Sequence, residues 1–197
     1  MLDFPVEAAQ RQEYYQVIRH EIEQLSGITT SMLSLAHPRP GTVQVADVVE
    51  AVQHVLRLAG KRLEQSGTEV TTDLDPVPPV LCLPEHLTTV FLNLVVNVGE
   101  AMPDTDSGRL HIAVGETEGQ VIVSFTNNGP AIPVHVLPHI FEPFYTTKPD
   151  GYGLGLWISH KLLQGAGTLT VRNLEDGLGV VFDVMLDTEP SLTAGKG

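Results

Sequence analysis

The sequence has a single cysteine, Cys82, among its 197 residues. One cysteine excludes an intramolecular disulfide and any zinc site built from several cysteines. Long apolar runs are also missing, because no stretch approaches the roughly 20 apolar residues that a membrane-spanning helix needs, and residues 1–20 lack the apolar core of a signal peptide. These absences predict a cytoplasmic protein with no membrane contact through this chain.

Basic residues are scarce as well. The chain has 11 Lys and Arg against 24 Asp and Glu, a formal net charge of −13. Such a surface repels phosphate backbones and anionic lipid, so we expect no nucleic-acid partner. Between Leu63 and Thr147 Arg109 is the sole basic residue. Backbone amides or a metal ion must therefore do much of the work if this part of the chain binds an anion.

The chain is long enough for one domain and an appendage, at about 150 residues per domain. Residues 1–40 are expected to form a helix of a bundle. Its apolar and small residues recur in steps of four and three, as in the seam of a coiled coil: Ile18, Ile22, Leu25, Thr29, Met32, Ala36. The segment Pro38–Gly41 ends that helix. We expect a second domain over 41–188 and a disordered tail over 189–197.

Within the second domain the hydrophobic pattern alternates between helical and strand periods. Asp47 is expected to cap a helix that runs to about Gln65, and Pro84 to open a very apolar helix that runs to about Met102. A third helix is expected over 156–164. Strands are expected over 42–45, 68–74, 109–115, 120–126, 168–172 and 180–187. Grouped strands with interspersed helices predict an α+β fold, a two-layer sandwich of a mixed sheet covered by helices.

A glycine-rich run, Gly151-Tyr-Gly-Leu-Gly-Leu156, precedes the third helix. Glycines let backbone amides approach an anion closely, and a helix N-terminus adds positive partial charge, so the run is a candidate phosphate cradle. It lacks the last glycine of the dinucleotide fingerprint and the Gly-Lys-Ser/Thr of a P-loop. A purely structural turn is the alternative.

Three further features accompany the glycines. Asn93 and Asn97 lie one turn apart in the apolar helix, where their amides either bond nearby backbone or face a ligand, one of them supplying a hard oxygen to Mg²⁺. Asn127-Asn-Gly-Pro130 follows a strand and also fits an ordinary turn. Phe141-Glu-Pro-Phe-Tyr-Thr-Thr-Lys148 is an aromatic-rich loop that is costly to expose unless it packs on something or moves.

In order and spacing, these four features resemble the N, G1, F and G2 boxes of the catalytic ATP-binding domain of bacterial sensor histidine kinases. The similarity extends over residues 10–187. The resemblance implies the Bergerat ATP-binding fold, ATP and Mg²⁺ as cofactors, and protein-histidine kinase chemistry, a phosphoryl transfer in which positioning and charge neutralisation supply most of the catalysis.

The resemblance also implies a role for each matching position. Asn97 ligates Mg²⁺ with Asn93 beside it, Asn127 faces the adenine amino group, and Lys148 reaches the γ-phosphate from a mobile lid over 143–152. Asn93, Asn97 and Lys148 are the implied catalytic residues. The implied nucleotide-binding residues are Asn93, Asn97, Asn127, Gly129, Ala131, Ile132, Phe144, Thr147, Lys148, Gly151, Gly153, Leu154, Gly155 and Leu156.

Three positions depart from related patterns. The family's adenine-binding Asp is Asn127 here, and the second glycine of that box is Ala131. An Asn carbonyl still accepts a hydrogen bond, worth about 0.5–1.5 kcal/mol where a charged acceptor gives about 1.5–3, so we expect weaker but retained ATP binding. Related ATPases carry a water-activating Glu at the position of Asn93, which disfavours hydrolase chemistry.

The histidines give no second chemistry. His20-Glu21 looks like a phosphoacceptor pair but lacks the family's following Asn-Pro, and residues 18–38 look instead like the second helix of the dimerisation hairpin. We therefore expect the phosphoacceptor helix to be absent from this chain. His135 and His139 have no third ligand in view, and we interpret them as solvated surface rather than a metal site.

Three hypotheses follow for the function. The first is a kinase domain that phosphorylates a histidine on a missing or separate helix, forms a homodimer through residues 10–37, and serves a response regulator receiver domain. The second is a degenerate nucleotide-binding or dimerisation module that regulates a partner without kinase activity. The third is a helical dimer with a vestigial pocket.

Overall fold

The computed structural model describes residues 44–102, 108–148, 151–175 and 177–188. The chain divides into two compact units, Met1–Pro38 and Arg39–Gly197, and every described residue belongs to the second. The expected bundle helix over 1–40 and the expected tail over 189–197 lie outside the described residues.

A five-stranded mixed sheet forms one layer of the described unit, with strand order β1-β2-β3-β5-β4. β1 is parallel to β2, and the remaining neighbours are antiparallel. The strands are β1 (Glu69–Leu74), β2 (Arg109–Thr117), β3 (Gln120–Asn127), β4 (Gly167–Asn173) and β5 (Val180–Asp187). The parallel pair requires a crossover, which is the second helix along this unit.

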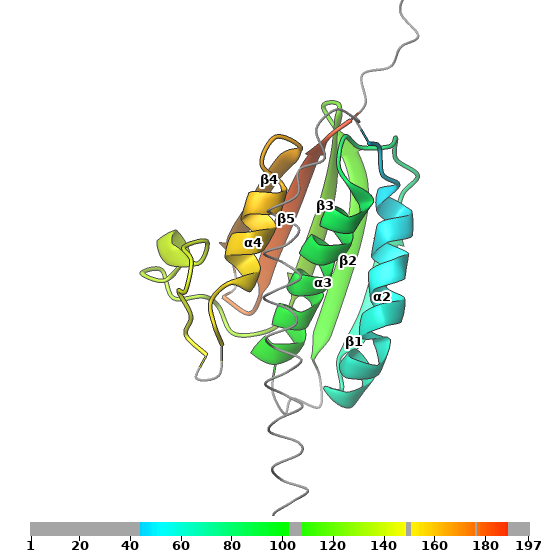
Figure 1. Ribbon diagram of the computed structural model, residues 1–197. Coiled ribbons are helices and arrows are strands. Elements are labelled where there is room, and N and C mark those ends of the chain that lie inside the picture. Colours follow the sequence, from blue (N-terminus) through cyan, green and yellow to red (C-terminus); the bar gives the residue numbers. More distant parts are fainter. Residues whose placement is uncertain (1–43, 103–107, 149–150, 176, 189–197) are drawn as a thin grey trace, which may run out of the picture. The chain divides into compact units, whose positions relative to one another are not determined.

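Three helices form the other layer and cover one face of the sheet: α2 (Val48–Gln65), α3 (Pro84–Ala101) and α4 (Gly155–Leu162) (Figure 1). The Asp47 side chain caps α2 by accepting a hydrogen bond from the Glu50 amide at 2.9 Å. Pro84 occupies the first turn of α3, where its missing N–H costs nothing. A 3-10 turn, η1 (Leu137–His139), interrupts the long connection from β3 to α4.

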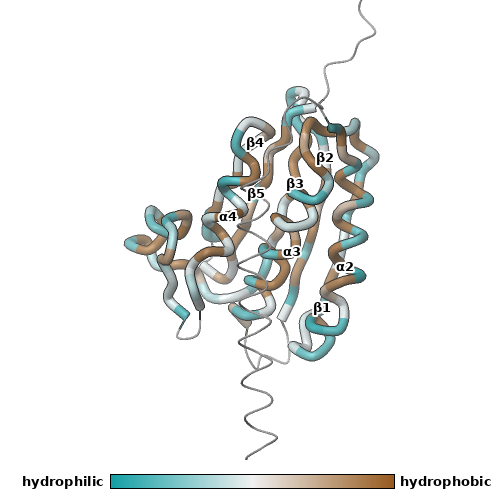
Figure 2. Tube along the Cα trace, viewed as in Figure 1, coloured by the Kyte–Doolittle hydropathy of each residue, from teal (hydrophilic) through white to brown (hydrophobic). Residues whose placement is uncertain are grey.

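The core lies between the two layers, where apolar segments of the strands and helices face one another (Figure 2). Phe91 of α3 and Phe125 of β3 are both fully buried, and their ring centroids lie 5.4 Å apart. Burying side chains of this size stabilises a fold by roughly 1.5–3 kcal/mol each. α3, the crossover helix between β1 and β2, is therefore fixed against the centre of the sheet.

The predicted α+β sandwich, a mixed sheet covered by helices, is confirmed. The predicted strand over 42–45 is wrong for its described part, because residues 44 and 45 are not in a strand and only the adjacent Ala46 forms an isolated bridge with Val80. No helix in the described ranges is long and apolar enough to cross a membrane.

Candidate functional site

A long connection between β3 and α4, residues 128–154, projects beside α4 (Figure 1); we call it the β3–α4 loop. Its described residues are 128–148 and 151–154. The Asn173 side chain at the end of β4 fastens the loop near its start, because its amide accepts from the Ile132 N–H and donates to the Ile132 carbonyl, each at 2.8 Å. The loop thus leaves the sheet along a fixed path.

The second half of the loop closes on itself at its base. The Phe144 N–H donates to the Gly153 carbonyl at 3.0 Å. Gly153 has φ +65°, and a Cβ there would lie 2.5 Å from the Phe144 carbonyl carbon and the Tyr145 carbonyl oxygen. Only glycine fits that approach. The chain at Phe144 and Tyr145, shortly before Lys148, therefore lies directly against Gly153.

At the end of β3, the polar residue Asn127 is buried, with 4% of its surface exposed. Its Oδ1 accepts a hydrogen bond from the Gly129 N–H at 2.9 Å. A Cβ on Gly129 would lie 2.9 Å from that oxygen and 3.3 Å from Cγ of Met102, near the end of α3. The first turn of the β3–α4 loop is thereby pressed closely against α3.

The two asparagines of α3 have different partners. Nδ2 of Asn93 donates to the Gly155 carbonyl and to Oγ of Ser159, both at 3.1 Å. Asn93 therefore connects α3 to the first turn of α4. Its amide nitrogen bonds backbone, which was one of the two roles considered from the sequence. The Asn93 contact also brings the glycine-rich run beside the helix that carries Asn97.

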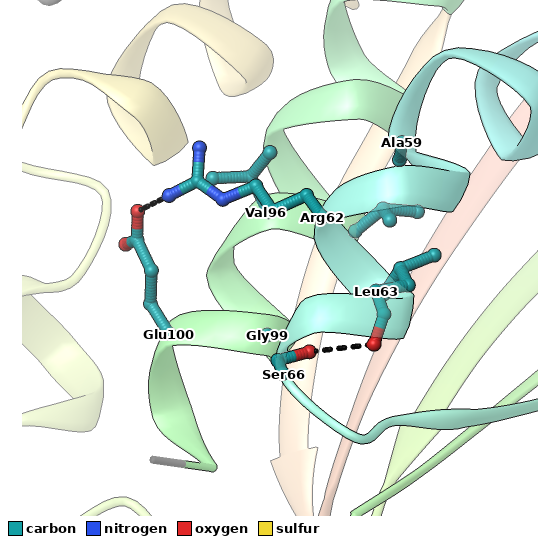
Figure 3. Close-up of a pocket in the computed structure, with 8 residues that line it drawn as sticks. Ala59, Arg62, Leu63, Ser66, Val96, Gly99 and Glu100 are labelled. Carbon is teal, nitrogen blue, oxygen red and sulfur yellow. Dashed lines mark hydrogen bonds and ion pairs between the residues drawn. The ribbon is translucent and has the colours of Figure 1, made fainter.

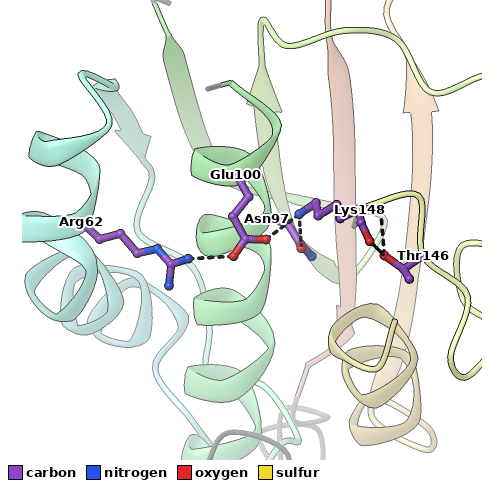
Figure 4. A network of polar contacts seen from close by, with 5 residues as sticks. All are labelled: Arg62, Asn97, Glu100, Thr146 and Lys148. Carbon is purple, nitrogen blue, oxygen red and sulfur yellow. Dashed lines mark hydrogen bonds and ion pairs between the residues drawn. The ribbon is translucent and has the colours of Figure 1, made fainter. Parts of the chain in front are cut away.

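Asn97 has a cationic partner instead. Nζ of Lys148 lies 3.3 Å from Oδ1 of Asn97 and 2.6 Å from Oε2 of Glu100, one turn further along α3 (Figure 4). Oε1 of Glu100 accepts from the Arg62 guanidinium of α2 at 2.7 Å. The network thus joins α2, α3 and the β3–α4 loop through one carboxylate. The Thr146 hydroxyl accepts from the Lys148 N–H at 3.1 Å and shapes the turn that presents the lysine.

The remaining predicted positions lie along the same loop and at the start of α4. Leu154 is buried, Ala131, Gly151, Gly155 and Leu156 are half-buried, and Thr147 is exposed. Phe144 is 70% exposed and has φ +65°. The structure therefore brings Asn93, Asn97, Lys148 and Gly155 together, while Phe144 and Thr147 remain at the surface.

A depression between α2 and α3 lies next to this network (Figure 3). Its volume is about 150 Å³, and it is lined by Ala59, Arg62, Leu63, Ser66, Val95, Val96, Gly99 and Glu100. Small-molecule sites usually measure roughly 300–1,000 Å³. The depression is smaller than such sites, and it shares Glu100 with the polar network.

Comparison with known proteins assigns the chain to a family. Residues 82–190, from just before α3 to just beyond β5, match the family model described as histidine kinase-, DNA gyrase B-, and HSP90-like ATPase. The chain belongs to this ATPase family. Its members bind ATP, and the matched region contains all four predicted boxes.

Two similar curated proteins are kinases by name. Sporulation kinase E of Bacillus subtilis is 32% identical over 176 residues, 88% of this chain and 23% of its own length. The sensor histidine kinase ZraS of Escherichia coli K12 is 30% identical over 173 residues, 87% of this chain and 37% of its own. The chain thus spans about a quarter to two-fifths of the length of these curated relatives.

A solved structure supports the same grouping. The catalytic domain of the histidine kinase ThkA superposes with a TM-score of 0.67 at 28% identity, covering 75% of this chain and 97% of the ThkA domain. The resemblance stated from the four motifs is confirmed, and with it the fold of histidine kinase catalytic domains.

Sequence reasoning missed three polar residues of this ATPase domain: Arg62, Glu100 and Asn173. Glu100 could have been found, since it lies three residues after Asn97 and therefore on the same helix face. Arg62 and Asn173 contact groups 38 and 41 residues away in the chain. No periodicity in the sequence indicates such pairings.

Proposed function

We propose that this domain binds Mg-ATP between α3, α4 and the β3–α4 loop and transfers its γ-phosphoryl group to a histidine. The acceptor histidine lies on a helix that is separate from the described residues. The observation that carries the proposal is the convergence of the four boxes: Asn97 meets Lys148, Asn93 meets Gly155, and Asn127 lies beside the end of α3.

The donor set around Asn97 fits Mg²⁺. Its Oδ1 already receives a cation, the Lys148 ammonium, and amide oxygens are among the hard ligands that Mg²⁺ accepts together with phosphate oxygens. When bound, Mg²⁺ would neutralise the phosphates in a part of the chain where basic residues are scarce. Asn97 would hold the ion, and Lys148 would contribute a second positive charge.

The phosphates would rest on backbone. The N-cap residue of α4, Leu154, gives no side-chain hydrogen bond to the helix, so the first amides of α4 are available to an anion. Gly153 and Gly155 would let a phosphate approach these amides. Asn93 would hold α4 at the correct place relative to Asn97 through the Gly155 carbonyl.

The base would lie near Asn127. Its buried Oδ1 accepts one hydrogen bond, from Gly129, and a carbonyl oxygen has two lone pairs. The second lone pair would accept from the adenine amino group. This contact would distinguish adenine from guanine, which carries a carbonyl at the same position.

Transfer to protein is favoured over transfer to water. Related hydrolases place a glutamate at the position of Asn93, and an amide cannot act as a general base. The Asn93 amide nitrogen is in addition already engaged by α4. We accordingly expect slow ATP hydrolysis and no phosphorylation of His20 when the chain is incubated alone with labelled ATP.

The partners follow from the same proposal. ThkA, 26% identical, has been solved in complex with the response regulator protein TrrA and superposes with a TM-score of 0.72. We propose a receiver domain as the final phosphate acceptor, a homodimer through residues 10–37, and a cytoplasmic location, where ATP and receiver domains are available.

A second candidate, a degenerate module that binds partners without catalysis, is favoured by two observations: the neutral Asn127 at the adenine position and Ala131 in place of a glycine. Thermal unfolding tests the nucleotide binding that the first candidate requires. A ligand at 100 times its Kd adds about 2.7 kcal/mol of stability, so the kinase proposal expects a raised Tm with Mg-ATP and a smaller change with Mg-GTP.

The matched control for that measurement is Asn97→Ala, which should abolish the Mg²⁺-dependent part of the shift. An unchanged Tm of the full chain at millimolar Mg-ATP would remove the kinase proposal and leave the binding module.

A further inference from the structure

We propose that Asn97 and Glu100 together form the cation site of this domain, that the Lys148 ammonium occupies it before nucleotide binds, and that Mg²⁺ displaces the lysine. Glu100 is thus assigned as a second protein ligand of Mg²⁺, and Lys148 as an internal substitute for the ion. The inference rests on the proposed function, because it needs Mg-ATP to bind beside Asn97.

The geometry supports one shared site. Asn97 and Glu100 lie three residues apart on α3, so their side chains project from the same face of the helix. Both oxygens reach the same atom, Nζ of Lys148, at 3.3 and 2.6 Å (Figure 4). An amide oxygen and a carboxylate oxygen that converge on one cation are the donors that a magnesium ion takes from protein.

The electrostatics of α3 disfavour a carboxylate at Glu100 unless a cation lies beside it. Glu100 lies in the last turn of α3, where the helix dipole is negative and where no basic residue occurs. A carboxylate at that end is unfavourable for the helix. Glu100 recovers stability only through cations brought from other elements, Arg62 of α2 and Lys148 of the β3–α4 loop.

The phosphates of ATP would also make Glu100 depend on a cation. A carboxylate beside the triphosphate would repel it, and the repulsion disappears only when a divalent cation lies between them. Glu100 therefore makes nucleotide binding depend strongly on Mg²⁺. When Mg²⁺ binds the Asn97 and Glu100 oxygens, it displaces the Lys148 ammonium, whose charge becomes available to the phosphates. Metal binding is therefore coupled to a change in the position of Lys148.

Mg²⁺ can replace the Lys148 ammonium because Glu100 holds that ammonium weakly. Lys148 and Glu100 side chains are 37% and 38% exposed, and ion pairs at such exposure contribute little net stability. A divalent ion bridged to phosphate competes successfully with a single exposed ammonium. Arg62 bonds the other oxygen of Glu100, Oε1, and leaves Oε2 to the incoming ion.

The test is calorimetric titration of ATP into the full chain, with saturating Mg²⁺ and with EDTA, for wild type and Glu100→Gln. The glutamine keeps the shape and removes the charge. Mutation of even an outer-shell partner of a metal ligand typically costs about 10- to 100-fold in metal affinity. The ratio of the Kd in EDTA to the Kd with Mg²⁺ should therefore fall by at least about tenfold in Glu100→Gln. Affinity in EDTA should stay equal or rise.

Two control variants make the result specific. Arg62→Gln removes the other ion pair of the same carboxylate, and Glu116→Gln removes one exposed carboxylate from β2; both should keep the wild-type Mg²⁺ ratio. Thermal unfolding without nucleotide verifies that every variant is folded. A wild-type ratio in Glu100→Gln, or an equal loss in Arg62→Gln, would overturn the assignment of Glu100.

The same titration separates this inference from the function beneath it. If wild type binds Mg-ATP while Glu100→Gln changes nothing, the proposed function stands and the two-ligand site falls. Absence of any Mg-ATP binding by wild type would contradict the proposed function, and the inference with it.

Discussion

The two-layer framework and the β3–α4 loop are stabilised by different forces. The framework buries whole apolar side chains between sheet and helices, as with Phe91 and Phe125. The loop buries few apolar side chains, Val136, Ile140 and Leu154, and exposes others, including Val134 and Phe144. It is also fastened by polar contacts such as the Asn173–Ile132 pair. Apolar burial resists local change, whereas exposed polar contacts exchange with ligand or water at small cost.

The site residues divide in the same way between the framework and the loop. Asn93, Asn97 and Asn127 stand on framework elements, α3 and β3, and hold fixed positions. Lys148 stands on the loop and contacts α3 through two polar groups, the half-buried Asn97 and the exposed Glu100. We infer that the framework supplies preformed acceptors and the loop supplies the charge that moves.

The largest expected effect on stability comes from truncating a phenylalanine of the framework, and a phenylalanine of the loop is the matched comparison. Phe125→Ala removes a fully buried ring that packs on Phe91, and such truncations cost about 3–5 kcal/mol. Phe144→Ala, at 70% exposure, should change the free energy of unfolding by less than about 0.5 kcal/mol. Urea denaturation of both variants measures the contrast, and equal losses would show that the loop belongs to the core.

The buried Cys82 thiol should make the stability of the framework depend on pH. Desolvation by burial raises the pKa of Cys82 to about 11, with a smaller opposing effect from a backbone hydrogen bond and a smaller raising effect from Glu85. The folded state therefore holds the thiol proton more tightly than the unfolded state. Stability from this group is complete below the unfolded pKa and is lost as pH rises toward 11.

Between pH 9 and 10.5 that loss amounts to about 1.5 kcal/mol. Other groups also titrate in this range, so the measured quantity is the difference in unfolding free energy between wild type and Cys82→Ala at each pH. The difference should shrink by about that amount as pH rises. A constant difference would mean that Cys82 is not desolvated.

Two glycines with positive φ offer a finer contrast. Alanine in the left-handed region costs roughly 1–2 kcal/mol. At Gly165, between α4 and β4, nothing lies within 4 Å of the added Cβ, and we expect that cost in global stability. At Gly153 the Cβ meets the loop backbone, and we expect the loop base to open while global stability changes by less than about 0.5 kcal/mol.

Amide hydrogen exchange provides the local measurement. The Phe144 N–H, which donates to the Gly153 carbonyl, should lose its protection in Gly153→Ala and keep it in Gly165→Ala. Retained protection at Phe144 in both variants would contradict a separately opening loop base.

The sequence was informative wherever one short segment contained the whole signal. The Asp47 cap and the apolar face of α2, Pro84 at the start of α3, and the alternating strands β2 and β3 are local patterns, and each was predicted. The expected strand at 42–45 failed because its described part has no ladder partner, and pairing is a tertiary property.

For the site, the order of four motifs was sufficient to identify the family, but it did not predict which groups touch. Lys148 and Glu100 are 48 residues apart, and Asn93 and Gly155 are 62 apart. Their pairing depends on how the β3–α4 loop returns to α3. Motif spacing along the chain carries no information on that path.

The smallest expected effect concerns the framework acceptor Asn127. Asn127→Asp replaces a neutral acceptor with a charged one, which should strengthen its bond to the adenine amino group by about 1 kcal/mol, roughly fivefold in the Kd for Mg-ATP. The Asn127 side chain is 4% exposed, so the new carboxylate also loses hydration in the nucleotide-free protein, and the Tm without ligand should fall. Titration calorimetry and thermal unfolding on the same sample measure both changes. Tighter binding with a lower ligand-free Tm would show that Asn127 trades affinity for the stability of a buried site, whereas weaker binding would place the adenine elsewhere than at the end of β3.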